Sequence, residues 1–214
     1  MAFRNAKLAC FIATVVLGFG CGPKSAADTE KDFNATVENA QKYASKYPAA
    51  KALIDDLTKQ AKADFDEAKK ADEKSRADKM SVAVDKLGKP LEVFKNYESE
   101  WTKLEGLQHD KDLMSMSAAD FNPLDQAASA AKKKGCCILQ PTEKVCSDLP
   151  GTCPTGVPPL ANMGDLKAKL EGAIADMQTA EKALAAKKPK PAAPAAPTGS
   201  AAPAGSAAPA GAKK

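Results

Sequence analysis

The sequence predicts an all-α fold, an elongated bundle of about four to five amphipathic helices with an irregular disulfide-bonded loop and a disordered tail. Apolar residues recur every three or four positions over most of the chain, as on one face of a helix. Alanine, lysine, aspartate and glutamate are abundant whereas valine and isoleucine are few, which favours helix over strand. Much of the 44% hydrophobic content is alanine, so long thin helices are expected rather than a deeply packed core.

The formal net charge of +4 is unevenly distributed. Two of the 31 basic residues lie before Cys21 and five lie from Lys187 onward, which leaves 24 basic against 27 acidic residues between them. The body of the chain is therefore slightly acidic. It offers no basic face large enough to indicate nucleic-acid binding, so no nucleic-acid partner is expected.

The N-terminus has the three zones of a signal peptide. Two basic residues come first, an apolar run of 12 residues follows at 8–19, and small residues then precede Cys21; the basic and small residues are Arg4, Lys7, Gly18 and Gly20. A membrane-spanning helix needs about 20 apolar residues, so this run has the length of a signal-peptide core instead. Residues 1–20 are therefore predicted to be a signal peptide.

Residues 1–22 resemble the signal of bacterial lipoproteins, in which a leucine-like residue and two small residues precede the cysteine that is acylated. Here Leu17 lies four positions before Cys21 rather than three, and Phe19 stands where a small residue is usual. The resemblance implies a lipid on Cys21 that anchors the chain to a membrane of the bacterial cell envelope, on the periplasmic or outer surface. Secretion without a lipid is the alternative.

The spacing of the cysteines favours the prediction that Cys21 carries a lipid. The five cysteines from residue 21 onward include four within a span of 18 residues, which can pair among themselves: Cys136, Cys137, Cys146 and Cys153. Cys21 is more than 100 residues away from them. An exported protein with an unpaired cysteine needs an explanation, and acylation supplies one.

A short linker at 21–27 leads into a helical domain predicted at 28–187. Its first apolar stripe predicts a helix over 26–47, and Pro48 either ends this helix or starts the next one. The next stripes predict helices near 49–87 and 90–108. Ion pairs would hold the polar stretch between Lys69 and Lys79 helical, and Gly88 and Pro90 would produce a kink or a short break.

Two further helices are predicted after residue 120. Asn122 and Pro123 are typical of a helix cap and first residue, and Gly135 of the residue that follows a helix. A last helix is predicted from Asp165 to Lys187 because one face carries a run of large apolar residues: Leu166, Leu170, Ile174, Met177 and Leu184. The apolar stripes are expected to pack against one another, and a groove for a partner helix or an acyl chain is the alternative.

Residues 135–159 hold the four clustered cysteines among three glycines and five prolines, so an irregular loop closed by two disulfides is predicted. Bonds between sequence neighbours are strained, which leaves Cys136–Cys146 with Cys137–Cys153, or Cys136–Cys153 with Cys137–Cys146. The CC-x8-C-x6-C spacing lacks the close pairs of zinc ligands and the CxxC of redox enzymes, so no metal site is expected.

The tail at 188–214 repeats Gly-Ser-Ala-Ala-Pro-Ala and cannot bury a core, so it is predicted to be disordered. A solvated tail without a partner is one interpretation, and a spacer towards peptidoglycan or an anionic surface is the other.

Catalytic motifs are absent from the sequence. His109 is the only histidine and stands beside Asp110 and Asp112, a setting typical of a solvated helix end rather than a catalyst. Neither a nucleophile elbow, nor a phosphate loop, nor a metal-binding histidine pair occurs. No catalytic residue and no cofactor are therefore predicted.

The predicted function is that of a non-enzymatic structural or interaction module of the cell envelope, with the membrane, an envelope protein or peptidoglycan as partner. The alternative is a periplasmic ligand-binding or holdase-type carrier that uses an apolar groove between helices.

Overall fold

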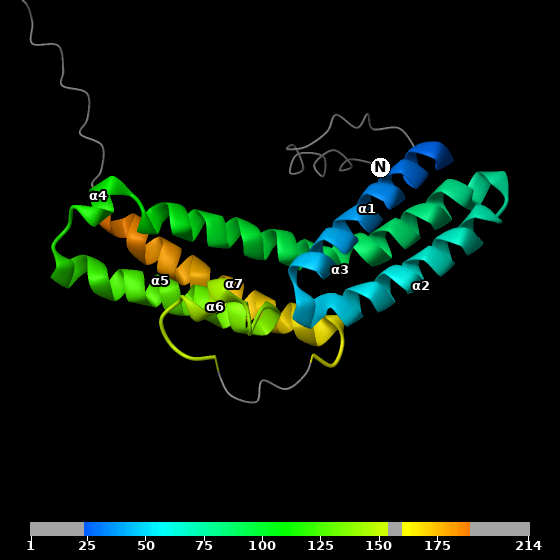
Figure 1. Cartoon of the computed structure of the whole chain (residues 1–214). Helices are drawn as coiled ribbons and strands as arrows, with labels where there is room; N and C mark the ends of the chain where they lie inside the picture. Colours follow the sequence, from blue (N-terminus) through cyan, green and yellow to red (C-terminus); the bar gives the residue numbers. More distant parts are fainter. Residues whose placement is uncertain (1–23, 154–159, 189–214) are drawn as a thin grey trace, which may run out of the picture.

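The computed structural model describes residues 24–153 and 160–188. This part of the chain consists of helices joined by turns and contains no strand, which confirms the predicted all-α class (Figure 1). Its longest element, α3 (Glu73–Gln108), takes part in two groups of three helices. The predicted signal peptide, Cys21 and the tail after Lys188 lie outside the described residues.

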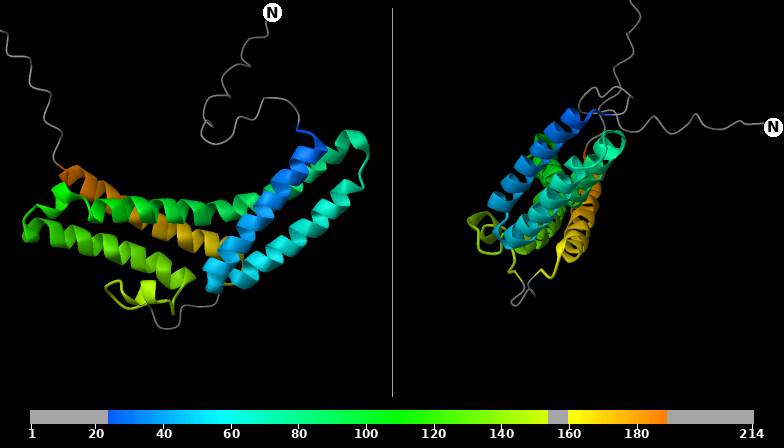
Figure 2. Two further views of the ribbon diagram at one scale, coloured as in Figure 1. Left: turned by 45° about the horizontal axis from the view of Figure 1, so that its top comes forward. Right: turned by 90° about the vertical axis from the view of Figure 1, so that its right-hand side faces the viewer.

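We call these groups the N-terminal and the C-terminal bundle. In the N-terminal bundle, α1 (Ala26–Lys46) and α2 (Lys51–Lys69) pack on the first half of α3. In the C-terminal bundle, α5 (Ala118–Leu139) and α7 (Met163–Lys187) pack with its second half. Figure 2 shows that the bundles follow each other along an elongated molecule and that α3 changes direction between them.

The N-terminal bundle begins and turns at capped positions. Ser25 precedes α1, and its hydroxyl accepts a hydrogen bond from the backbone N–H of Asp28 at 3.1 Å. Pro48 opens a short 3-10 helix, η1 (Pro48–Ala50), which leads directly into α2 as predicted. These side-chain and proline signals are the usual ones for helix starts.

The predicted continuous helix over 49–87 is wrong, because the chain reverses after Lys69. Asp72 caps α3, and its carboxylate accepts a hydrogen bond from the Ser75 N–H at 3.1 Å. The loss of large apolar residues after Lys69 marks the turn between two antiparallel helices rather than an exposed stretch of one helix. Aspartate is favoured at the N-cap of a helix, where its carboxylate accepts a backbone N–H, and is disfavoured inside a helix.

The predicted helix ends near residues 87 and 90 are also wrong, since α3 continues through Gly88 and Pro90 to Gln108. Pro90 stands near the midpoint of this helix, and α3 changes direction between the two bundles (Figure 1). A proline removes one helix hydrogen bond and bends the axis without necessarily ending the helix. The kink that the sequence predicted therefore joins the two bundles.

Helix α5 starts earlier and ends later than predicted. Ser117, rather than Asn122, caps α5 by accepting a hydrogen bond from the Asp120 N–H at 3.3 Å, and Pro123 lies inside the helix. The helix ends at Leu139, just before Gln140 and Pro141, rather than at Gly135. A residue that precedes proline is disfavoured in the helical region, so Pro141 is the terminator.

The remaining elements are short except for the last. Two single-turn helices, α4 (Lys111–Met114) and α6 (Lys144–Ser147), flank α5 in the chain. The last helix, α7, begins two residues before the predicted Asp165 and ends at the predicted Lys187. The five apolar residues predicted on one of its faces are all buried, which confirms that this face packs in the core.

Aromatic side chains connect the cores of the two bundles. Phe33 of α1 and Phe65 of α2 stack with ring centroids 3.9 Å apart. On α3, the ring centroid of Phe94 lies 5.4 Å from that of Tyr47, and the ring centroid of Tyr97 lies 5.9 Å from that of Trp101. Within the described residues, no helix is both long and apolar enough to cross a membrane.

Candidate functional site: the cysteine cluster

The four clustered cysteines come together beside the C-terminal bundle. Cys136 and Cys137 lie in the last turn of α5, Cys146 in α6, and Cys153 in the loop that follows. The first three are buried, with exposed fractions of 1%, 4% and 0%. The prediction that residues 135–159 contain no helix is wrong, because α5 runs to Leu139 and α6 forms within this segment.

One disulfide joins two of these residues, Cys137 and Cys153, whereas Cys136 and Cys146 are buried thiols. This bond belongs to the first of the two predicted pairings and not to the second. The prediction of two disulfides is wrong, because Cys136 and Cys146 are not bonded to each other. The sulfur of Cys146 lies 3.7 Å from that of Cys153 and 4.0 Å from that of Cys137. Burial raises the pKa of the Cys136 thiol, and a hydrogen bond with Cys146 raises it further.

Lys133 holds the cysteine segment against α5. Its ammonium group is buried and donates hydrogen bonds to the backbone carbonyls of Cys146, at 2.5 Å, and Leu149, at 3.2 Å. Buried ammonium groups need such acceptors, since an unpaired charge is costly to remove from water. One side chain of α5 thus holds the backbone at Cys146, within α6, and at Leu149, just after α6.

Lys132 is buried on another side of α5. Its ammonium lies 4.5 Å from the centroid of the Trp101 ring and donates to the Gln108 side chain at 3.2 Å. Burial lowers the pKa of Lys132, while the nearby acidic side chains Glu105 and Asp125 act in the opposite direction. Trp101, predicted to be a core residue, is half-buried between the main core and the cysteine cluster.

Gly135 lets α5 approach α3. A Cβ atom at this position would overlap the Tyr97 ring, so no larger residue fits without a shift of that ring or of the helix. The glycine predicted as a helix terminator is therefore a point of close contact inside a helix. Burial also raises the pKa of Tyr97, and the nearby Cys136 and Cys146 add to that effect.

An apolar groove runs along the outer side of the disulfide. It has a volume of about 580 Å³ and lies between α5, α7 and the loop before Cys153; Ala130, Ile138, Pro150, Ala168 and Gly172 contribute to its lining. Three lysines also line it, and each has a partner. Lys134 pairs with Asp176 at 2.6 Å, Lys169 with Asp165 at 2.9 Å, and Lys133 with the carbonyls described above.

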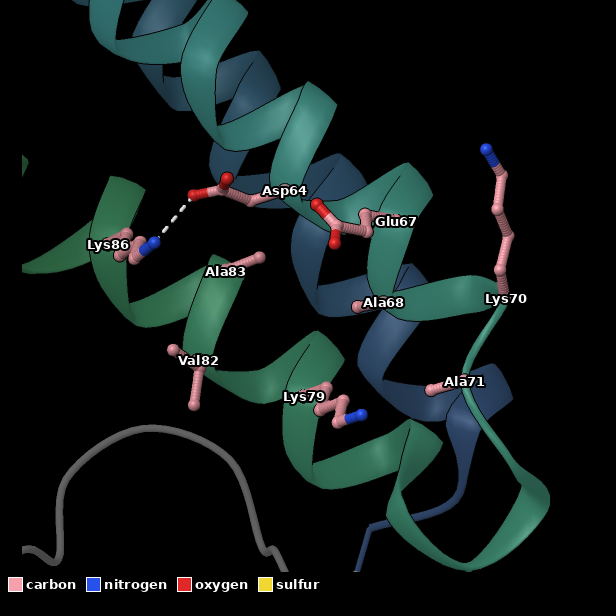
Figure 3. A pocket seen from close by; sticks show the side chains of 9 residues that line it. All are labelled: Asp64, Glu67, Ala68, Lys70, Ala71, Lys79, Val82, Ala83 and Lys86. Carbon is pink, nitrogen blue, oxygen red and sulfur yellow. Dashed lines mark hydrogen bonds and ion pairs between the residues drawn. The ribbon is translucent and has the colours of Figure 1, made fainter.

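A second hollow of about 530 Å³ lies between α2 and α3 in the N-terminal bundle. Figure 3 shows that an ion pair between Asp64 and Lys86, 2.7 Å long, crosses it. Its rim carries both acidic and basic groups, including Glu67 and Lys79, and its floor is mainly alanine. This mixture selects no class of ligand by charge.

His109 lies where the sequence predicts, at an exposed helix end. It is the C-cap of α3, and its Nδ1 atom lies 2.8 Å from the carbonyl oxygen of Glu105. Sequence reasoning missed Lys133 and Gly135 as parts of the site. It placed Gly135 just after a helix, because a glycine there is typical of a C-terminal cap.

No protein-family profile, no characterised protein and no solved structure matches this chain.

Proposed function

We propose that this chain is a lipid-anchored protein of the bacterial cell envelope, attached through Cys21, with a non-enzymatic structural or interaction role. The observation that carries the proposal is the disulfide between Cys137 and Cys153 in a chain whose first residues resemble a lipoprotein signal. Disulfides persist in oxidising compartments, which an exported protein reaches. With Cys137 and Cys153 bonded to each other, Cys21 has neither of them as a partner.

The helical core supports an interaction role rather than catalysis. The fully buried side chains of the C-terminal bundle, such as Leu104, Leu166 and Met177, fill the space between its helices. Ion pairs on the surface, such as Lys46 with Glu98 at 2.7 Å, keep the outer faces polar. We infer that an envelope protein or peptidoglycan contacts these outer faces.

The anchor is tested with Cys21→Ala and, as control, Cys10→Ala in the apolar run that precedes Cys21. Cells that express each variant are given labelled palmitate and are then separated into membrane and soluble fractions. We expect wild type and Cys10→Ala to take up label and to fractionate with membranes, and Cys21→Ala to do neither. An unlabelled wild type, or a Cys21→Ala variant that stays with membranes, contradicts the proposal.

The interaction role is tested by crosslinking in intact cells, followed by identification of the attached envelope components. A reproducible protein or peptidoglycan fragment is the expected product. Crosslinking that yields only the chain itself contradicts this role.

The apolar groove between α5 and α7 favours one alternative, a carrier of lipids or unfolded chains. Ala168 lies in its lining, so Ala168→Phe would occupy part of the groove, whereas Ala185→Phe on the same helix is exposed and serves as control. A carrier should copurify with lipid or suppress aggregation of an unfolded protein, and should lose that property in Ala168→Phe alone. Equal behaviour of both variants and wild type argues against it.

A further inference from the structure

The sulfur atoms of Cys137, Cys146 and Cys153 form a compact trio. They all lie within 4.8 Å of one another although the residues come from a helix end, a short helix and a loop. Because these cysteines are widely spaced in the sequence, no metal site was expected from the sequence alone. The fold removes that objection, because coordination depends on distances in space rather than along the chain.

The distances within the trio match those between the ligands of a metal ion. A zinc–sulfur bond of about 2.3 Å in tetrahedral geometry separates two sulfurs by about 3.8 Å. The Cys146 sulfur lies 3.7 Å from Cys153 and 4.0 Å from Cys137. Only the third separation is too short, because Cys137 and Cys153 are bonded to each other. Opening that bond is the one change required.

We propose that reduction of the Cys137–Cys153 disulfide turns the trio into a site for a thiophilic ion such as Zn²⁺ or Cu⁺, held by Cys137, Cys146 and Cys153. A dithiol reductant donates two electrons and two protons, becomes a disulfide itself, and leaves two thiols on the chain. The ion then displaces the protons of the three thiols as it binds. Soft thiolate ligands select this class of ion over Mg²⁺ or Ca²⁺.

The surroundings of the trio suit three thiolates. Trp101 and Leu149 pack against it and limit the access of water, while Cys137 also lines the open groove between α5 and α7, which gives the ion and the reductant an entry path. Lys133 places a buried positive charge beside the cluster and holds the backbone of Cys146 through its carbonyl. Groups that orient metal ligands in this way influence metal affinity.

Cys136 completes the arrangement without belonging to the trio. Its thiol is buried in the same cluster as Cys137 and Cys146. Lys133, which holds the Cys146 carbonyl, is therefore a positioning residue, and the three thiolates of the trio are the ligands.

The test uses the whole chain, oxidised or reduced by a dithiol that is then removed without oxygen. Zinc binding is measured in competition with a coloured chelator, and cadmium is added in parallel to record its sulfur charge-transfer absorption. We expect one ion per reduced chain and none per oxidised chain. Cys146→Ser should weaken zinc binding by more than about 100-fold, beyond the usual effect of an outer group, and Ser147→Ala beside it should leave binding unchanged.

Lys133→Met should weaken binding about 10-fold to 100-fold, whereas Lys134→Met, which removes an exposed lysine of the same helix, should not. Two further measurements apply if Cys146→Ser does not fold. Zinc should raise the thermal midpoint of the reduced wild type and should slow alkylation of all three thiols. Zinc binding no tighter in reduced wild type than in Cys146→Ser overturns the proposal, and so does an unchanged midpoint with unchanged alkylation.

Discussion

The two bundles differ in what fills their interiors. In the N-terminal bundle the one buried polar residue is Thr29, whose hydroxyl donates to the carbonyl of Ser25 at 2.9 Å. The other four buried polar or charged residues of the described chain all belong to the C-terminal bundle: Glu100, Ser129, Lys132 and Lys133. The clustered cysteines lie there too.

This difference predicts two modes of stabilisation along one shared helix. Burial of apolar area is non-directional and stabilises the N-terminal bundle wherever large side chains meet. The C-terminal bundle also buries leucines, but its polar interior depends on particular hydrogen bonds, which are costly to leave unmade. Its stability should therefore respond to redox state and pH, and that of the N-terminal bundle to side-chain volume.

The largest expected effect is that of Phe65→Ala in the N-terminal bundle. The substitution removes the ring that stacks on Phe33 and leaves a cavity, so the free energy of unfolding should fall by about 3–5 kcal/mol in urea denaturation. Val82→Ala is the control, because Val82 is 56% exposed and its loss should change stability by less than about 0.5 kcal/mol. Similar losses in the two variants would contradict the apolar packing described for this bundle.

Removal of the disulfide should affect mainly the C-terminal bundle. The double variant Cys137→Ala/Cys153→Ala opens a loop with a sequence separation of 16, which should cost about 3 kcal/mol in the chain-entropy description. Hydrogen exchange should then show faster exchange in the last turns of α5 and unchanged protection in α1 and α2. Equal loss of protection in both bundles would show that they unfold as one unit.

Gly135→Ala tests the close contact between α5 and α3. The added methyl group overlaps the Tyr97 ring, so the free energy of unfolding should fall by about 1–3 kcal/mol, in contrast to the usual gain when alanine replaces a helical glycine. Gly106→Ala is the matched control, since a Cβ there meets no atom within 4 Å and should stabilise α3 by up to about 1 kcal/mol. Thermal unfolding of the two variants should therefore shift in opposite directions.

Gly135 also shows how far the sequence determined the fold. Helical periodicity predicted the all-α class and the buried face of α7, because those signals are repeated over many residues. The helix ends at 70–72, 117 and 139 were missed, because a single serine, aspartate or glycine has several structural roles. Only the neighbouring helix decides among them, as Tyr97 does for Gly135.

The site was predictable to a smaller extent. The clustering of the four cysteines and two alternative pairings followed from their spacing, and only one of these alternatives contains the observed bond, Cys137 with Cys153. The buried position of Lys133 did not follow from the sequence, because its acceptors are backbone carbonyls 13 and 16 residues later, and backbone groups carry no sequence signal. The proximity of Cys146 to the disulfide likewise depends on how α6 folds back on α5.

The smallest expected effect concerns a pair of carboxyl groups between α3 and α7. Burial raises the pKa of Glu181, and the interactions with the neighbouring Glu100 raise it further. Ionisation of Glu181 therefore lowers the free energy of unfolding as the pH rises. Burial acts to raise the pKa of Glu100 as well, but hydrogen bonds, the first from Lys103, outweigh it and lower that pKa. Glu100 therefore stabilises the fold above its unfolded pKa and loses that contribution as the pH falls through its folded pKa.

Glu181→Gln should accordingly stabilise the chain at pH 7, by no more than about 0.5 kcal/mol because this side chain is partly solvated. Near about pH 3, where Glu181 is protonated in wild type, the difference should vanish. Glu100→Gln should instead destabilise the chain at pH 7, since it removes the carboxylate that pairs with Lys103 at 2.7 Å. Urea denaturation at both pH values measures these differences, and equal effects of the two substitutions at pH 7 would contradict the opposite pKa shifts. Because the pair joins α3 to α7, any such pH dependence belongs to the C-terminal bundle, the half whose interior is polar.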